Sequence, residues 1–382
     1  MSTAPLQAPI DRVTVGLFSS TFLLALIGVP LYGVLVGYSA SAWAWFGVFL
    51  VASGLSITAG YHRLWAHRAF EAHWSVRLFF MLFGAMSIQN SIYIWSALHR
   101  PHHRFVDDEA TDPYSIRRGL WFAHMGWMLR RYPSGEPDFK YVKDLERDPI
   151  VMFQHRHYVP IVLVMNIVVP LLAGFLTGDA LGTLLLAGAL RLVVNHHATF
   201  FINSLAHYWG TRPYTDENTA RDNPALALVT YGEGYHNFHH KFAHDYRNGI
   251  RWWHWDPTKW LIRGLSTVGL THKLRVTPAV SIEHARLEME FKRAQERLAK
   301  RAASPEWHHS IAALREHVAL EYEAFRATLA EWSAAREAWV SETRERVAEQ
   351  FAHVDLKAYA REIEARLRAQ RQRLELLTLQ LA

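Results

Sequence analysis

Three short segments of this sequence place histidines at spacings that suit metal ligation. They read HRLWAH at 62–67, HRPHH at 99–103 and HNFHH at 236–240. In the second and third segments the histidines stand at positions i, i+3 and i+4, so a helix would put all three imidazoles on one face. His62 and His67 are five residues apart, and that spacing needs a helix end or a wider turn.

Eight imidazoles exceed what one metal ion needs, so the pattern indicates two ions. The chain has no cysteine, which excludes a thiolate zinc site, an iron–sulfur cluster and a cysteine nucleophile. Imidazoles with few anionic ligands suit iron, which can change oxidation state and activate oxygen. Zinc would explain binding but not so many ligands. Any single group could consist of ordinary surface histidines; the three together favour a metal centre.

Four apolar runs are long enough to cross a bilayer, which takes roughly 20 residues. They are Val13–Gly37, Ala42–Gly60, Tyr158–Thr177 and Leu181–Ile202, the last containing Arg191, which is costly at mid-bilayer and must snorkel or face the protein interior. Lysine and arginine concentrate in residues 61–157 and after 203, which predicts that both termini and the histidine segments are cytoplasmic. We therefore expect an all-α integral membrane protein: four transmembrane helices, a cytosolic histidine-rich helical cap and a long helical C-terminal extension.

Residues 74–95 form a further apolar stretch. A fifth span here would put the first two histidine segments on opposite sides of the membrane. We therefore expect an interfacial helix instead.

The chain changes character near residue 281, which divides it into 1–280 and 281–382. The formal charge of the whole chain is +6, yet residues 283–382 carry 17 basic and 17 acidic residues. This balance argues against a nucleic-acid-binding arm. Apolar residues recur at helical spacing, so we expect a helical hairpin or coiled coil broken near Ser304-Pro305. Self-association and docking of a partner protein are both open as its role.

The histidine segments resemble the three histidine boxes of the membrane fatty acid desaturases, most closely the stearoyl-CoA (acyl-CoA) Δ9 type, in a bacterial-like form. The resemblance continues through Asp112-Pro113, Arg117-Arg118-Gly119, His124-Met125-Gly126-Trp127, Asn203-Ser204-Leu205-Ala206-His207 and Asp245-Tyr246-Arg247. It covers about residues 10–275 and leaves out the tail.

The resemblance implies a di-iron centre with nine histidine ligands: His62, His67, His99, His102, His103, His207, His236, His239 and His240. Asn203 matches a residue that reaches a metal through water. From the residues alone, His207 would look like an ordinary histidine at the end of a span. Asp112 and Glu233 are candidates to orient imidazole N–H groups. His196 and His197 are expected to pack or to hydrogen-bond behind the ligands.

The resemblance also implies O2-dependent formation of a cis double bond, at Δ9, in a long-chain saturated acyl-CoA. Asn90, Arg130 and Arg131 match head-group positions of the family, and Arg117 and Arg118 are further candidates. Candidates for the floor of an acyl tunnel are Phe46 and Leu50. For the arginines, plain positive-inside charge explains the pattern equally well; for Phe46 and Leu50, lipid-facing packing is the alternative. The animal members of the family have charged residues before the second box where this chain has Trp95-Ser96-Ala97-Leu98, so acyl-carrier-protein thioesters and glycerolipid acyl chains stay open as substrates.

No bound haem or flavin is expected, because no haem-binding segment is recognisable. Electrons would come from a separate ferredoxin, cytochrome b5-like protein or flavin reductase, and a bacterial inner membrane would be the location. Two alternatives remain: a di-iron hydroxylase or ketolase acting on another lipid, and a non-catalytic metal-binding membrane scaffold.

Overall fold

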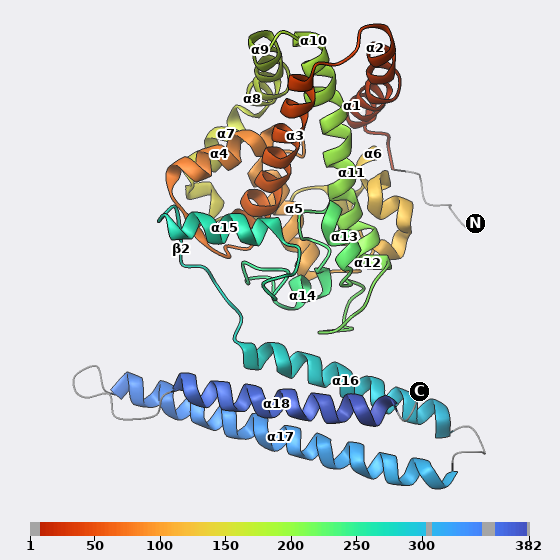
Figure 1. Ribbon diagram of the computed structural model, residues 1–382, viewed down its shortest axis with the longest axis vertical. Coiled ribbons are helices and arrows are strands. Elements are labelled where there is room, and N and C mark those ends of the chain that lie inside the picture. Colours follow the sequence, from red (N-terminus) through yellow and green to blue (C-terminus); the bar gives the residue numbers. More distant parts are fainter. Residues whose placement is uncertain (1–7, 303–307, 346–355, 380–382) are drawn as a thin grey trace. The chain divides into compact units, whose positions relative to one another are not determined.

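The computed structural model describes residues 8–302, 308–345 and 356–379. The chain divides into two compact units, Met1–Arg212 with Glu217–Val276, and Pro213–Asp216 with Thr277–Ala382. In the described part of the first unit, the regular secondary structure is helical apart from one two-residue strand pair, and this part carries all three histidine segments (Figure 1).

Four helices of the first unit are long and apolar enough to cross a membrane, as predicted. The first, Arg12–Leu35, consists of α1 (Arg12–Leu23), η1 (Leu24–Gly28) and α2 (Val29–Leu35). The second, Ala40–Ala66, consists of α3 (Ala40–Leu55) and η2 (Ser56–Ala66). The third, Tyr158–Leu176, consists of α8 (Tyr158–Leu163), η8 (Val164–Val168) and α9 (Val169–Leu176). The fourth, Ala180–Tyr208, consists of α10 (Ala180–Thr183), η9 (Leu184–Leu190), α11 (Arg191–Asn203) and α12 (Leu205–Tyr208).

The Asp179 carboxylate connects the link between the third and fourth spans to the link between the first and second spans. Asp179 caps α10 by accepting from the Gly182 N–H at 2.8 Å, and it also accepts from the Tyr32 hydroxyl at 2.9 Å and the Ser39 N–H at 3.1 Å. These bonds satisfy backbone donors that a helix start leaves unpaired and hold the two hairpins together.

Arg191 faces the protein interior and is fully buried. Its guanidinium donates to the carbonyl oxygens of Ala187 and Met86, at 2.9 and 2.7 Å, and to Asn166 Oδ1 at 2.6 Å. The charge within the span is therefore solvated by protein dipoles rather than by lipid, which removes most of the cost of placing it there.

The apolar stretch at 74–95 does not form a fifth span. It divides into α4 (Trp74–Ala85) and the start of α5 (Ile92–Arg104), and 12 residues of α4 are too short to cross a bilayer. Phe80 and Met81 of α4 are buried, whereas Trp74 and Phe79 are exposed, as in an interfacial helix.

The rest of the first unit surrounds the ends of these helices that carry the histidines. Its helical segments are η3 (Ile116–Arg118), η4 (Phe122–Gly126), α6 (Trp127–Leu129), η5 (Pro133–Gly135), η6 (Phe139–Tyr141), η7 (Leu145–Arg147), α7 (Pro149–Arg156), α13 (Pro224–Val229), α14 (His236–Lys241) and α15 (Pro257–Thr267). Strands β1 (Glu71–Ala72) and β2 (Thr271–His272) pair antiparallel with Glu71 opposite His272. A core that includes Tyr61, Phe80, Ile92 and Ile262 packs η2, α4, α5 and α15 together. Full burial of such a side chain contributes about 1.5–3 kcal/mol.

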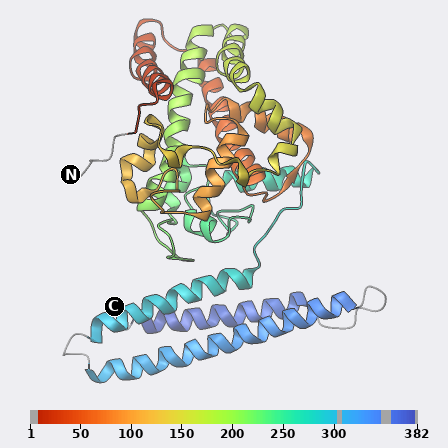
Figure 2. The ribbon, with the colours of Figure 1, turned by 180° about the vertical axis from the view of Figure 1, so that it is seen from behind.

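The second unit contains three long helices, α16 (Ala279–Ala302), α17 (His308–Glu345) and α18 (Leu356–Leu379), which run side by side (Figures 1 and 2). Leu287, Phe291, Phe325, Ile363 and Leu367 from all three form one buried core. The sequence predicted a helical hairpin or a coiled coil, and the described residues form three helices, one more than a hairpin has. The expected break at Ser304-Pro305 lies outside the described residues.

Candidate metal centre

The first histidine segment lies on a π-helix, and this explains its spacing. In η2 the backbone bonds run from residue i+5 to residue i, as in the 3.0 Å bond from the His67 N–H to the His62 carbonyl. A π-turn brings positions five apart onto one face, so the two imidazole rings lie 4.7 Å apart between centroids. The wider turn that the spacing required is therefore present.

The other two segments are on α-helices. His99, His102 and His103 lie in the last part of α5, and His236, His239 and His240 lie in α14. His207 comes from α12, at the end of the fourth span. All of these side chains are buried or half-buried.

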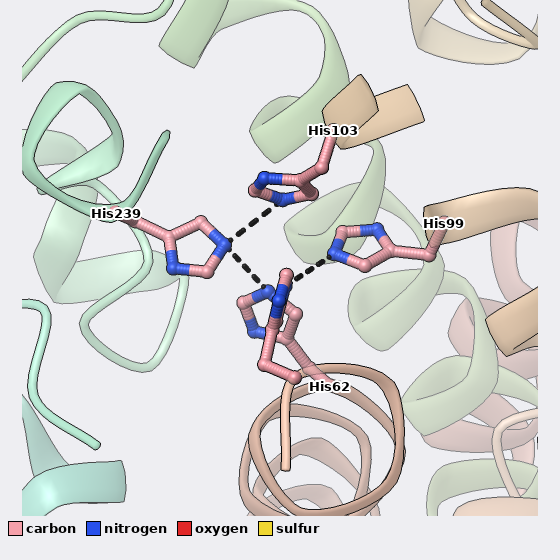
Figure 3. A group of neighbouring side chains, drawn as sticks. His62, His99, His103 and His239 are labelled. Carbon is pink, nitrogen blue, oxygen red and sulfur yellow. Dashed lines mark hydrogen bonds between the residues drawn. The ribbon is translucent and has the colours of Figure 1, made fainter. Parts of the chain in front are cut away.

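The nine predicted ligands converge in two groups whose nitrogen atoms lie within 4.8 Å of one another. One group contains His62, His67, His99, His103 and His239, and the other contains His102, His207, His236 and His240. Figure 3 shows His62, His99, His103 and His239 pointing toward a common centre from η2, α5 and α14. The polypeptide therefore brings together ligands up to 178 positions apart in the sequence.

The spacing of the nitrogen atoms fits ligands of a metal ion. Nε2 atoms of the first group approach at 2.9 Å for His62 and His239 and at 3.1 Å for His239 and His103. In the second group, His236 Nε2 lies 3.1 Å from His207 Nε2. Neighbouring ligands around an ion with bonds of about 2.1 Å are about 3 Å apart.

Burial keeps these imidazoles in the form that binds metals. It lowers the pKa of His99, His103, His236, His239 and His240, and the mutual repulsion of neighbouring imidazoles lowers it further. A neutral imidazole has a free lone pair, which the protonated form lacks.

Carboxylates fix the orientation of one imidazole in each group. Glu233 Oε2 lies 3.1 Å from His62 Nδ1, and Asp112 Oδ1 lies 2.8 Å from His102 Nδ1. Burial would raise the pKa of Glu233, but its interactions with His62 and with the Arg63 guanidinium outweigh burial and lower the pKa to about 2. Burial likewise opposes ionisation of Asp112, but His102 and the Asp107 N–H lower its pKa below the ordinary value. An ionised carboxylate only accepts hydrogen bonds, so Nδ1 carries the proton and the Nε2 lone pair points into the group.

Two further orienting partners escaped the sequence-based prediction. The Tyr114 hydroxyl lies 3.1 Å from His99 Nδ1, and Thr219 Oγ1 lies 2.9 Å from His207 Nδ1. Thr219 in turn donates to Asp107 Oδ1 at 2.6 Å, while the Asp107 N–H donates to Asp112 at 3.0 Å. Nothing in the sequence around Thr219 marks it, whereas Asp107 at least follows the second histidine segment.

Arg63, inside the first histidine segment, was also missed. It is almost completely buried, and it donates to Glu233 at 2.8 Å, to Asp256 at 3.1 Å and to the Tyr246 carbonyl at 2.8 Å. Its guanidinium therefore ties the carboxylate that orients His62 to the start of α15. A fork of five donors is suited to this bridging role.

The remaining polar candidates lie behind or beside the groups. Asn203 is half-buried at the last residue of α11, one turn before His207. His196 Nε2 contacts the Ser87 carbonyl at 2.7 Å, and His197 Nδ1 contacts His124 at 3.0 Å. These two histidines lie in neither metal-binding group.

The predicted substrate residues lie in four separate segments of the chain. Arg130 and Arg131 hold the start of the chain, through Ala8 and Asp11. Arg118 lies over the rings of Phe122 and Tyr132, at 3.7 and 4.3 Å, whereas Arg117 and Asn90 are exposed. Phe46 and Leu50 are half-buried in α3, where Phe46 packs against the core of Val29, Ala42 and Leu186.

Comparison with known proteins identifies what this architecture is similar to. The family model for fatty acid desaturases matches residues 21–272. "Acyl-CoA desaturase 1" of Saccharomyces cerevisiae is 44% identical over 290 residues, which cover 73% of this chain and 56% of that protein. The "Probable acyl-CoA desaturase" of Schizosaccharomyces pombe is 47% identical over 237 residues, 62% of this chain and 49% of that protein.

An insect protein is also similar. The "Acyl-CoA Delta12-desaturase" of Acheta domesticus is 41% identical over 247 residues, 62% of this chain and 68% of that protein. The chain spans about half the length of the two yeast relatives. The family match ends before α16, so the helical tail lies outside it.

Proposed function

The chain belongs to the fatty acid desaturase family, and from that premise we propose that it is an oxygen-dependent desaturase that introduces a cis double bond into a long-chain acyl-CoA. The observation that carries the proposal is the convergence of nine imidazoles in two adjacent groups. The names of the yeast relatives support acyl-CoA as the substrate class.

We propose iron as the metal, one ion in each group. The donor set is nitrogen-rich and contains no thiolate, and this combination suits an ion that must change oxidation state. Two irons would supply the activation of O2 that removal of hydrogen from a saturated chain requires. Glu233 and Asp112 hold the protons on the outer nitrogens of His62 and His102, and Asn203 would reach its ion through water.

The acyl-CoA head group would bind on the side of the membrane that holds the histidines, which we place in the cytoplasm because lysine and arginine concentrate there. Arg117 is exposed and has no partner among the described residues, so it is the arginine best placed to meet a phosphate. Arg130 and Arg131 already bind the start of the chain. Electrons would come from a separate donor protein.

Fatty-acid analysis of cells that express this chain with a competent electron donor tests the proposal. We expect a new cis mono-unsaturated acid that is absent with His239→Ala and present with the control His272→Ala, whose side chain is half exposed and pairs with Glu71. Locating the double bond decides between Δ9 and the Δ12 position named for the insect relative. A hydroxylated product, or no product from a chain that binds two irons, would contradict the proposal.

A further inference from the structure

Large apolar side chains are exposed on the part of the first unit that follows the fourth span. They belong to the end of α13 and to the turn and helix around α15: Leu228, Val229, Trp252, Trp253, Trp255 and Trp260. We call these six residues the tryptophan ledge. The exposed fractions reach 82% at Trp252 and 60% at Leu228. In water such a surface would be unfavourable, so it indicates a partner.

Contacts with the second span give the depth of the ledge. The Tyr231 hydroxyl donates to the Leu50 carbonyl at 3.1 Å, and Thr258 Oγ1 lies 2.7 Å from Thr58 Oγ1. At 1.5 Å per residue from Ala40, Leu50 lies about 15 Å and Thr58 about 27 Å along a hydrocarbon core of about 30 Å. Thr258, at the start of α15, therefore lies near the boundary between hydrocarbon and head groups, whereas the Tyr231 hydroxyl reaches Leu50 near the middle of the core.

Gly54 makes this approach possible. A Cβ at position 54 would lie only 2.1 Å from the Tyr231 ring, so the ring occupies the space that a side chain would fill. The Tyr231 side chain thus reaches toward the middle of the span, directly after the exposed Leu228 and Val229.

The tryptophans lie on and beside a turn that hydrogen bonds from Lys259 stabilise. The Lys259 ammonium donates to the carbonyl oxygens of Gly249 and Arg251, at 2.6 and 2.8 Å, and Asp256 caps α15 by accepting from the Lys259 N–H at 2.8 Å. The turn from 249 to 255 is therefore fixed at the start of α15, which lies across the lower end of α3 and η2 in Figure 1.

The ledge is continuous with the interfacial helix α4. β2 follows α15 and pairs with β1, which leads into α4, and the His73 N–H donates to the Leu270 carbonyl at 2.9 Å. α4 exposes Trp74 and Phe79. Tryptophan is enriched at membrane interfaces because its ring is apolar and its N–H is polar.

The exposed charge beside the ledge is positive. Arg251 and Arg263 are exposed, and Arg251 lies 5.2 Å from the centroid of the Trp253 ring. The nearby acidic residue, Asp256, is buried and pairs with Arg63. This arrangement complements anionic head groups.

We propose that the tryptophan ledge is a membrane-contact surface additional to the four spans, which places its indole rings among the head groups and upper acyl carbons of anionic phospholipid. Glu233 and His236 follow Tyr231 by two and five residues. Binding of the ledge to lipid therefore fixes the segment that supplies both an orienting carboxylate and a metal-binding imidazole. The inference does not depend on which reaction the centre performs.

The absence of cysteine allows a direct test by spin labelling. Trp252→Cys and Val229→Cys, each carrying a nitroxide, would be compared in nanodiscs of phosphatidylcholine and phosphatidylglycerol with Leu23→Cys near the middle of the first span and Glu109→Cys in the loop after α5. Leu23 and Glu109 are both exposed. We expect both ledge labels to be more accessible to O2 than to a water-soluble nickel complex, with ratios between those of the two controls.

Ledge labels that behave like the label at Glu109 would overturn the proposal and would leave the surface for a protein partner such as the electron donor. Replacing phosphatidylglycerol with phosphatidylcholine, or introducing Arg251→Gln with Arg263→Gln, should shift both ledge labels toward the aqueous control. No shift in either experiment would contradict the preference for anionic lipid.

Discussion

The two histidine groups differ in what holds their imidazoles in position. In the first group, Glu233 orients His62 and is itself paired with the buried Arg63. In the second group, Asp112 orients His102, and no lysine or arginine of the described residues forms an ion pair with Asp112. Asp112 instead accepts from the backbone N–H groups of Asp107 and Tyr114, at 3.0 and 3.2 Å.

This difference separates two structural roles. The network of the first group joins η2 to Glu233 and Asp256, two segments about 170 and 190 positions later in the sequence, and so it also holds the unit together. The network of the second group is mostly local, between residues 102 and 114, and among the described residues Thr219 extends it to a distant part of the chain. Disruption of the first network should therefore lower both the stability of the unit and its affinity for metal. Disruption of the second should lower mainly the affinity for metal.

Arg63→Met should have the largest effect. It leaves Glu233 and Asp256 as buried carboxylates without their cation, a change that costs about 3–5 kcal/mol in stability. We expect a lower melting temperature in detergent and less iron per chain. Lys273→Met removes an exposed cation from its pair with Glu71 and should cost no more than about 1 kcal/mol.

Arg63→Lys tests whether the positive charge at this position is enough or whether the shape of the guanidinium is also needed. It keeps the positive charge but cannot bridge two carboxylates and a carbonyl in the same way, so its melting temperature should lie between those of Arg63→Met and the unaltered protein. If Arg63→Met melts like the unaltered protein, the network does not hold the unit together.

A matched pair of carboxylate variants sharpens the comparison. Asp112→Asn should weaken binding of one of the two proposed irons by about 10–100-fold, and it should lower the melting temperature of the metal-free protein less than Glu233→Gln does, because no buried cation loses a partner. Glu233→Gln should weaken binding of the other iron to a similar degree and also lower that melting temperature, because Arg63 loses a partner. Iron titration with Mössbauer spectroscopy measures the first effect, and thermal melting measures the second. Equal melting temperatures would remove the distinction between the groups.

The sequence predicted the four spans and eight of the nine clustered histidines because each of these has a strong local pattern. A long apolar run directly indicates a membrane span, and the spacing of His99, His102 and His103 indicates that they share one face of a helix. The spacing of His62 and His67 required a wider turn, but a π-helix that extends the second span to Ala66 has no recognisable residue pattern. The predicted end at Gly60 was therefore too early.

The orienting network could be predicted only in part, because its members are distant in sequence and ordinary in type. Asp112 and Glu233 stand near histidine segments and were found. In the sequence, Arg63 looks like one of the many basic residues expected on the cytoplasmic side, and Thr219 is an ordinary polar residue in a loop. Their roles depend on Glu233 and His207, which only folding brings close to them. His207 was found through a family resemblance, not through its spacing.

Thr219→Val should give the smallest effect and tests whether the second group depends on its one distant contact. The substitution removes the hydroxyl that contacts His207 Nδ1 and donates to Asp107, while the Thr219 N–H still donates to Asp107 at 2.8 Å. Loss of one such hydrogen bond costs about 1 kcal/mol, which corresponds to about fivefold weaker binding of one iron. Thr219→Ser keeps the hydroxyl and should bind iron like the unaltered protein. If both variants bind iron equally well, His207 is held by the packing of α12 alone, and the second group is even more local than its hydrogen bonds indicate.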